Sequence, residues 1–180
     1  MIIVISGPSG VGKSSIIKEL SVNKDLYFCV SSTTRPIRSN EVEGIDYKYI
    51  DNDQFKSMID KDLFIEYEEY GNYLYGTSKE ELLKQKEFKS IILDLEVNGA
   101  LHILQRYTDS YGIFVDISDE LIVERLKHRG DNDDDFINTR LSLASKQREH
   151  MDSFDYVIIN KEINITVKKI TDIIYNDILW

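Results

Sequence analysis

The chain has 180 residues, of which 42% are hydrophobic and 30% charged, so it is long enough for one globular domain with a buried core. Its net charge of −10 argues against general nucleic-acid binding, and no apolar run is long enough to span a membrane. Because Met1 leads directly into a strand-like run without a signal peptide, we expect a cytoplasmic protein that meets neither nucleic acid nor membrane.

Short β-branched runs alternate with segments of helical period, which predicts an α/β fold with a parallel sheet flanked by helices. Nearly continuous apolar runs suit strands buried on both faces, and they lie at 2–6, 26–31, 90–95, 111–117 and 155–160. Helical periodicity predicts helices at 13–22, 97–106, 119–129, 134–152 and 164–178. A capping-box pattern at Ser78 and Glu81 predicts one more helix to about residue 87, and the lone Cys29 is expected to be a buried thiol.

Two regions break this alternation. Residues 33–76 are rich in Tyr, Arg and Glu and predict an insert of short antiparallel strands. A short helix is expected there at about 53–60, started by Asp51 or Asn52. Residues 125–150 combine several arginines with the acidic stretch DNDDD, which marks a second specialised segment.

The segment from Gly7 to Ser14, GPSGVGKS, fits the pattern G-x-x-x-x-G-K-[ST] and lies between a predicted strand and a predicted helix. Its glycines allow backbone N–H groups and a helix N-terminus to converge on phosphate oxygens. Lys13 adds a charge near the β- and γ-phosphates, and Ser14 can ligate Mg²⁺. A glycine-rich turn with a surface lysine is the plainer alternative, but the strand-loop-helix context favours a nucleoside triphosphate site.

A second anion site is indicated by Arg35 and Arg38, two guanidiniums three residues apart on a chain stiffened by proline. Tyrosines nearby either pack in strands or contact a base or phosphate: Tyr47, Tyr49, Tyr67, Tyr70, Tyr73 and Tyr75. Glu66 and Glu96 stand beside apolar runs. They are either solvated strand-edge residues or acceptors for the two N–H donors of a base ring.

Seven sequence blocks occur in order along nearly the whole chain: ISGPSGVGKSS, VSSTTRPIRSNEVEGIDY, FIEYEEYGNYLYGTS, IILDLEVNGA, ERLKHRG, INTRLSLA and YVIIN. In these blocks and their spacing the sequence resembles the guanylate kinases, which transfer phosphate from ATP to GMP. The resemblance implies a parallel five-stranded P-loop core at 1–32, 81–120 and 151–180, a small mixed β-rich GMP-binding insert at 33–80 and a helical lid at 121–150. It further implies Mg²⁺ bound with ATP, in a monomer or homodimer.

Site residues also follow from the resemblance. It implies that ATP is bound by Gly7, Pro8, Ser9, Gly10, Val11, Gly12, Lys13, Ser14, Ser15 and Asn160, with Ser14 as the metal ligand. It implies that GMP is bound by Ser31, Arg35, Arg38, Glu41, Tyr47, Glu66, Tyr75, Gly76, Thr77, Asp94 and Glu96. The catalytic cations it implies are Lys13, Arg125, Arg129 and Arg140. A helix cap at Asp94, and a solvated face for Arg125 and Arg129, stay open as alternatives.

Three departures from the family pattern stand out. Gly71-Asn72 lies one place early in its turn, Glu96 stands where the family often has aspartate, and DNDDD replaces a Thr/Ser-Glu-Thr/Ser pattern. Two rival functions are an inactive guanylate kinase-like module that binds phosphopeptides and a P-loop kinase for another substrate. The intact Gly12-Lys13-Ser14 disfavours the first, and the arginine pair with Glu66 disfavours the second.

Overall fold

The computed structural model describes residues 1–39, 41–84, 88–128, 130 and 133–178. Its central sheet has five strands in the order β2 (Leu26–Phe28), β7 (Ser90–Asp94), β1 (Ile2–Ser6), β8 (Ser110–Asp116) and β9 (Tyr156–Ile159). Every neighbouring pair is parallel, so the carboxyl ends of all five strands meet at one edge. The predicted parallel sheet is confirmed.

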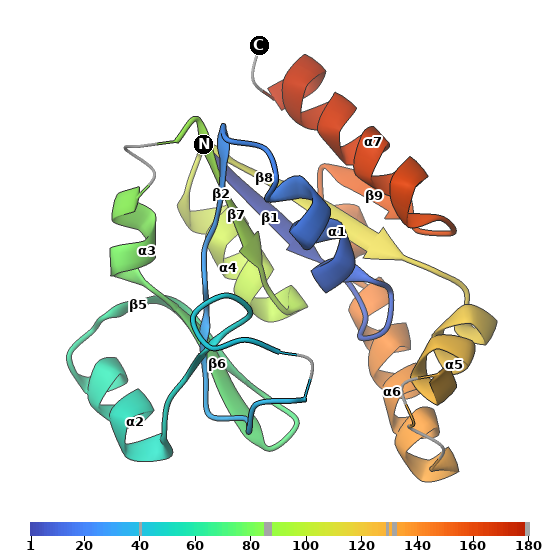
Figure 1. Cartoon of the computed structure of the whole chain (residues 1–180), viewed down its shortest axis with the longest axis horizontal. Coiled ribbons are helices and arrows are strands. Elements are labelled where there is room, and N and C mark those ends of the chain that lie inside the picture. Colours follow the sequence, from blue (N-terminus) through green and yellow to red (C-terminus); the bar gives the residue numbers. More distant parts are fainter. Residues whose placement is uncertain (40, 85–87, 129, 131–132, 179–180) are drawn as a thin grey trace.

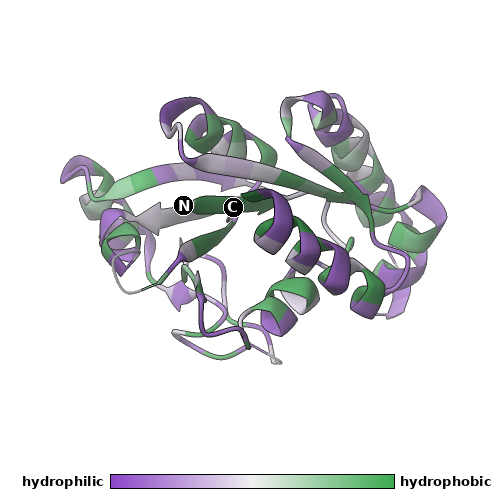
Figure 2. Cartoon of the chain, turned by 90° about the horizontal axis from the view of Figure 1, so that it is seen from above, coloured by the Kyte–Doolittle hydropathy of each residue, from purple (hydrophilic) through white to green (hydrophobic). Residues whose placement is uncertain are grey.

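Helices cover both faces of this sheet (Figure 1). The helices α1 (Lys13–Leu20) and α7 (Ile163–Ile173) pack on one face, and α7 continues into the π-helical turn η3 (Ile174–Ile178). The helix α4 (Val97–Arg106) covers the other face. Figure 2 shows the hydrophobic strands lying between helices whose outer surfaces are hydrophilic, as this layered fold requires.

Alternate side chains of the central strands enter two separate cores. Ile3 and Ile5 of β1 pack with α1 and α7, whereas Ile2 and Val4 pack with α4. These four side chains are 0–4% exposed. The continuous apolar run at residues 2–6 is therefore explained by burial on both faces. Cys29 is also fully buried, as expected, and burial raises the pKa of its thiol.

A second, smaller sheet has the order β4 (Lys48–Tyr49), β3 (Ser32–Thr33), β6 (Tyr73–Ser78) and β5 (Phe64–Tyr70). The pairs β3–β6 and β5–β6 are antiparallel, but β3 and β4 run parallel. The short antiparallel strands expected from composition are found in two of the three pairs but not in β3–β4, and the mixed β-rich insert that the resemblance implies is confirmed.

The helix α2 (Asn52–Asp60) lies beside this sheet and begins as expected after Asp51. The Asp51 carboxylate accepts a hydrogen bond from the backbone N–H of Gln54 at 2.7 Å, and the Gln54 side chain accepts one from the backbone N–H of Asp51. This reciprocal capping box satisfies two N–H groups that the first helical turn leaves without partners.

Two further helices, α5 (Asp119–His128) and α6 (Asp134–Arg148), follow β8 and project from the same end of the sheet as the smaller sheet does (Figure 1). Asp133 caps α6 by accepting from the backbone N–H of Asp135 at 2.9 Å. Part of the acidic stretch DNDDD thus serves a helix N-terminus, where negative charge is favourable. Residues 131–132 of that stretch lie outside the described residues.

Several predicted boundaries are too long. The strand predicted at 26–31 ends at Phe28, and the helix predicted at 134–152 ends at Arg148, followed by the short 3-10 helix η2 (Met151–Ser153). The helix predicted at 164–178 is α-helical only to Ile173 and then becomes η3. Hydrophobic periodicity continues through such changes in helix type, which is why the pattern alone missed them.

The predicted capping box at Ser78 is wrong, although α3 (Lys79–Leu83) begins where it was expected. Glu81 is fully buried, and its carboxylate accepts hydrogen bonds from Lys48, Lys84, Tyr27 and the backbone N–H of Val30. Burial opposes its ionisation, but these donors hold the pKa of Glu81 below its ordinary value. Residues 85–87, the predicted end of this helix, lie outside the described residues.

Among the described residues, no helix combines the length and the apolar character needed to cross a membrane.

Candidate active site

The glycine loop connects β1 to α1 at the carboxyl edge of the sheet. Gly7 has a φ of 135°, and a Cβ there would lie 2.0 Å from the carbonyl oxygen of Val115 in β8, so a side chain cannot fit. Gly12 has a φ of 99°, and its Cβ would lie 2.7 Å from the amide nitrogen of Asn160. Both ends of the loop therefore require glycine, which lets backbone N–H groups and the start of α1 approach a ligand closely.

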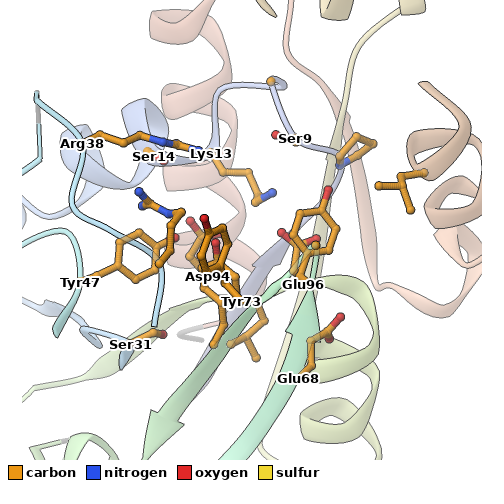
Figure 3. Close-up of a pocket in the computed structure, with 18 of the residues that line it drawn as sticks. Ser9, Lys13, Ser14, Ser31, Arg38, Tyr47, Glu68, Tyr73, Asp94 and Glu96 are labelled. Atoms are coloured by element: carbon orange, nitrogen blue, oxygen red, sulfur yellow. The ribbon is translucent and has the colours of Figure 1, made fainter. Parts of the chain in front are cut away.

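A cavity of about 770 Å³ lies between this loop, the smaller sheet and α6. Figure 3 shows Lys13 extending into it, on the side where Asp94 and Glu96 also lie. Most of the predicted site residues line it: Pro8, Ser9, Gly10, Gly12, Lys13, Ser14, Ser31, Arg35, Arg38, Glu41, Tyr47, Glu66, Tyr75, Gly76, Asp94, Glu96 and Arg140. The fold thus brings the glycine loop and the arginine pair to one space.

Lys13 and Asp94 define the centre of the cavity. The Lys13 ammonium donates to the carbonyl oxygen of Gly7 at 2.5 Å, which holds it over the glycine loop. Burial raises the pKa of Asp94 to about 6, and the nearby Lys13 offsets part of that rise. The helix cap considered for Asp94 is wrong, because the N-cap residue of α4 is Glu96.

The arginine pair is organised by one carboxylate. Arg35 is only 8% exposed and donates to Glu41 Oε1 at 2.7 Å, while its guanidinium lies 5.5 Å from the ring centre of Tyr47. Glu41 Oε2 accepts from the backbone N–H of Arg38 and from the hydroxyl of Tyr49. The Arg38 side chain is 58% exposed and lies 3.9 Å from Glu41. Glu41 therefore fixes Arg35 and the backbone of Arg38 while the guanidinium of Arg38 faces the cavity.

Glu66 reaches the cavity because β5 is irregular. The pairing of β5 with β6 shifts register between Phe64 and Glu66, and Phe64, Ile65 and Glu66 are all buried where a regular strand would alternate. Glu66 Oε1 accepts from the backbone N–H of Thr77 at 2.8 Å. Burial raises the pKa of Glu66 to about 7, and the bonds from Thr77 limit the rise. Glu66 is thus a buried carboxylate and not a solvated strand-edge residue.

The first turn of α4 packs against two carboxylates of β5. The backbone N–H of Gly99 donates to Glu68 Oε2 at 2.9 Å, and a Cβ on Gly99 would lie 2.8 Å from Glu66 Oε2. Glycine at this position lets the helix N-terminus approach both groups, where its positive end favours negative charge.

Ser31 and Thr77 complete this side of the cavity. Thr77 is fully buried, and its hydroxyl lies 2.9 Å from that of Ser31, which lines the cavity. Thr77 therefore orients Ser31 and Glu66 through hydrogen bonds on the side away from the cavity. The shifted Gly71-Asn72 forms a tight two-residue turn between β5 and β6, with Gly71 at a φ of 58°. Tyr75 remains opposite Glu68, so the early turn does not displace it from the cavity.

Arg125 and Asn160 lie on the other side of the glycine loop. Arg125 donates to the carbonyl oxygens of Val11 and Asn160, at 2.8 and 3.1 Å, and the Asn160 amide donates to Val11 at 2.6 Å. Arg125 is therefore docked on the loop and is not on a solvated face. Asn160 is fully buried, and its Oδ1 has no hydrogen-bond partner among the described residues. Arg125 and Ser15 line a second cavity of about 690 Å³ behind α1.

Arg140 comes from α6 and faces the smaller sheet across the main cavity. Its guanidinium donates to the hydroxyl of Tyr70 at 2.7 Å and lies 4.8 Å from the ring centre of Phe136. Arg140 thus links α6 to the tip of β5. Arg129, the remaining predicted catalytic arginine, lies outside the described residues.

Several lining residues were not predicted: Pro36, Ile37, Glu68, Gly71, Asn72, Leu95, Phe136, Thr139 and Leu143. Glu68 follows Glu66 by two positions, so strand alternation could have placed it on the same face. Phe136, Thr139 and Leu143 lie within four residues of Arg140, so helical spacing could have found them. The other positions carry no comparable signal.

A glycine loop at the carboxyl end of a central parallel strand, facing arginines that follow a strand of a separate small sheet, defines a P-loop kinase that acts on a small phosphorylated acceptor. The family model described as guanylate kinase matches residues 1–177. The guanylate kinase of Mycoplasma genitalium is 37% identical over 183 residues, covering 99% of this chain and 76% of that protein. That of Prochlorococcus marinus is 37% identical over 176 residues, covering 96% of each.

A comparison with solved structures leads to the same family as the sequence comparisons. The crystal structure of guanylate kinase from Anaplasma phagocytophilum superposes with a TM-score of 0.81 at 26% identity, covering 100% of this chain and 87% of that one. The chain therefore belongs to the guanylate kinase family, whose members are ATP:GMP phosphotransferases.

Proposed function

We propose that this chain transfers the γ-phosphoryl group of ATP to GMP, and also to dGMP, giving ADP and the nucleoside diphosphate. One observation carries the proposal: a single cavity places the glycine loop with Lys13 opposite Arg38 and the buried carboxylate of Glu66. A phosphate donor held at the loop and a guanine held at Glu66 direct their phosphates toward the middle of this space.

On the donor side, the backbone from Gly7 to Ser15 binds the ATP phosphates, with the Lys13 ammonium beside the β- and γ-phosphates. Asn160, whose buried Oδ1 has no partner among the described residues, is assigned to the neighbourhood of the adenine. Pro8, Ser9, Gly10, Val11 and Gly12 shape the loop.

The donor set around Ser14 fits Mg²⁺. Ser14 offers a hard hydroxyl oxygen in the cavity, and Asp94 adds negative charge on the same side. No group of three or more His, Cys, Asp or Glu among the described residues could hold a metal by itself. This suits an ion that keeps several waters and binds mainly through nucleotide phosphates. When bound, Mg²⁺ supplies positive charge to the phosphates, with Ser14 as its protein ligand.

On the acceptor side, Arg35 and Arg38 bind the GMP phosphate, assisted by the hydroxyls of Tyr47 and Tyr75. Glu41 acts through the arginines, because its carboxylate accepts from Arg35 and fixes that guanidinium in place. A preformed guanidinium site costs little conformational entropy when the phosphate binds.

The base is read by carboxylates. Guanine presents N1–H and its 2-amino group side by side, and a carboxylate accepts from both, whereas adenine has an acceptor at N1. We assign this role to Glu66, with Ser31, Thr77, Gly76 and Glu96 around the ring. An adenine here would offer the buried carboxylate a lone pair at N1 and no 2-amino donor, which gives discrimination between the two bases.

Transfer requires positioning and charge neutralisation. The attacking oxygen of the GMP phosphate is already anionic, so no general base is required. Lys13, Arg125, Arg129 and Arg140 would neutralise the transferring group. We propose that residues 33–80 act as the GMP-binding insert and 121–150 as a lid, which close over the core at 1–32, 81–120 and 151–180 and exclude water.

The test is ADP release measured with GMP, dGMP, AMP, UMP and dTMP in parallel. We expect rapid release with GMP and dGMP and little with the other three. Comparable turnover with AMP or a pyrimidine nucleotide would contradict the proposed substrate. Phosphopeptide binding without ADP release would instead support the inactive module considered above. Three further expectations stay predictions: that the protein is cytoplasmic, that it binds neither nucleic acid nor membrane, and that it is a monomer or a homodimer.

A further inference from the structure

Glu96 is held by a residue that none of the sequence motifs singled out. The Gln147 amide, in the last turn of α6, donates to Glu96 Oε2 at 2.7 Å. Glu96 occupies the N-cap position of α4, yet its side chain makes no capping hydrogen bond. Gln147 is the one hydrogen-bond donor to the Glu96 carboxylate within the described ranges, and it comes from a different element.

Gln147 donates from an anchored position. The next residue, Arg148, donates to Asp116 Oδ2 at 2.8 Å, to Asp119 Oδ1 at 2.6 Å and to the carbonyl oxygen of Ile117 at 2.7 Å. These three bonds fix the C-terminal end of α6 to the connection between β8 and α5. Gln147 therefore lies at the end of the proposed lid that is tied to the core, near the carboxyl end of β7, where Glu96 begins the next helix.

The chemistry of the pair suits a carboxylate whose second oxygen accepts from a ligand. A glutamate has one more rotatable bond than an aspartate, so it loses more conformational freedom when a ligand fixes it. The Gln147 amide supplies a donor without a positive charge, so Glu96 is oriented but not neutralised. Its other oxygen, Oε1, accepts from none of the described residues and remains available to a ligand in the cavity.

We infer that Gln147 is a positioning residue for base recognition, holding Glu96 Oε2 so that Oε1 faces the guanine of the acceptor nucleotide. The inference rests on the proposed function, because it assigns Glu96 to the GMP site. Gln147 itself does not line the cavity. Its effect on GMP must therefore pass through Glu96, which separates it from a residue that merely packs α6 against the core.

The experiment is calorimetric titration of the full chain with GMP and with ATP, using Gln147→Ala, Glu96→Ala and the double variant. Lys146→Ala serves as the matched control, because Lys146 is the exposed neighbour on the same helix. Gln147→Met keeps the volume of the side chain but removes the donor, so it covers the case in which alanine disturbs packing. Thermal unfolding checks that each protein is folded.

We expect Gln147→Ala and Gln147→Met to weaken GMP binding about tenfold and ATP binding by less than about twofold, as for loss of a hydrogen bond to a charged group. In the Glu96→Ala background, Gln147→Ala should cause no further loss, because the residue acts through Glu96.

The inference is overturned if both Gln147 variants bind GMP as the Lys146 control does, or if the losses add in the double variant. Additive losses would indicate a packing role. If the wild-type chain transfers phosphate to GMP and the Gln147 variants bind GMP with the wild-type affinity, only this inference is contradicted. A wild-type chain without transfer to GMP contradicts the proposed function as well.

Discussion

In the proposed function, the glycine loop and the smaller sheet each contribute to binding a nucleotide phosphate, but the two regions are built differently. The loop is one continuous stretch between β1 and α1, and it offers mostly backbone. The opposite side is made of side chains from the strands β5 and β6 and from Ser31, residues 35–38, Glu41 and Tyr47. A site made of backbone needs only a few glycines and one lysine at fixed positions in one short segment. A site made of side chains needs several residues from different segments, which orient one another through hydrogen bonds and ion pairs.

Charge is also arranged differently on the two sides. Lys13 donates to a neutral carbonyl oxygen and forms no ion pair within hydrogen-bond distance among the described residues, so most of its charge is available to a ligand. Arg35 is already paired with Glu41, so that guanidinium is fixed in place at the cost of partial neutralisation. In the proposed reaction the loop would therefore supply charge for the transferring group, and the smaller sheet would supply geometry and selectivity.

The largest effect is expected on the loop side. Lys13→Ala should lower kcat by about 10²–10³, corresponding to about 3–4 kcal/mol, because a preorganised cation near the transferring phosphoryl group is lost. GMP affinity should change little, since Lys13 acts on the donor phosphates. Steady-state rates at saturating GMP and calorimetric titration with GMP test both statements. A variant that keeps more than half of the wild-type kcat would contradict the assignment of the loop.

The second effect concerns base selectivity on the opposite side. Glu66→Ala should weaken GMP binding by about 10²-fold, because one buried carboxylate accepting from two donors is removed, while ATP affinity stays nearly unchanged. The readout is kcat/KM for GMP and for AMP in the same preparations. Equal small losses with both substrates would mean that the guanine is read elsewhere.

The contrast explains how much the sequence could predict. The loop and Lys13 were identified because their chemistry is local, and the five central strands because continuous apolar runs require burial on both faces. Arg35, Arg38 and Glu66 were singled out by the chemistry of their side chains, and the family resemblance then assigned them to GMP. The register shift that turns Glu66 inward depends on how β5 pairs with β6, and the contact between Gln147 and Glu96 joins positions 51 residues apart, so no local pattern encodes either.

A smaller effect should separate the two arginines. Arg38→Ala should weaken GMP binding about thirtyfold, or about 2 kcal/mol, and leave thermal stability unchanged because Arg38 is mostly exposed. Arg35→Ala should weaken GMP binding and also lower the melting temperature, because it leaves the carboxylate of Glu41 without its buried partner. Calorimetry and thermal unfolding of the two variants make the comparison. Identical melting temperatures would remove the structural role assigned to Arg35.

The smallest effect is a pH dependence that belongs to the acceptor side alone. Burial raises the pKa of Glu66 to about 7, and the guanine donors bind only its ionised form, so GMP binding must release a proton below that pH. The ionised fraction of a group with this pKa falls about tenfold between pH 8 and pH 6, and GMP affinity should fall with it.

The GMP phosphate also gains a proton near pH 6, so Glu66→Gln is the necessary control, because it keeps that titration and removes the carboxylate. The ratio of wild-type to variant affinity for GMP should rise with pH and level off above about 7. The linked effect on stability has the opposite direction. Because the folded pKa lies above the ordinary value, the ligand-free wild type should lose stability relative to the variant as the pH rises from about 4.5 to about 7. A ratio that stays constant from pH 6 to pH 8 would show that Glu66 does not titrate with GMP binding, and that the guanine is held by other acceptors of the smaller sheet.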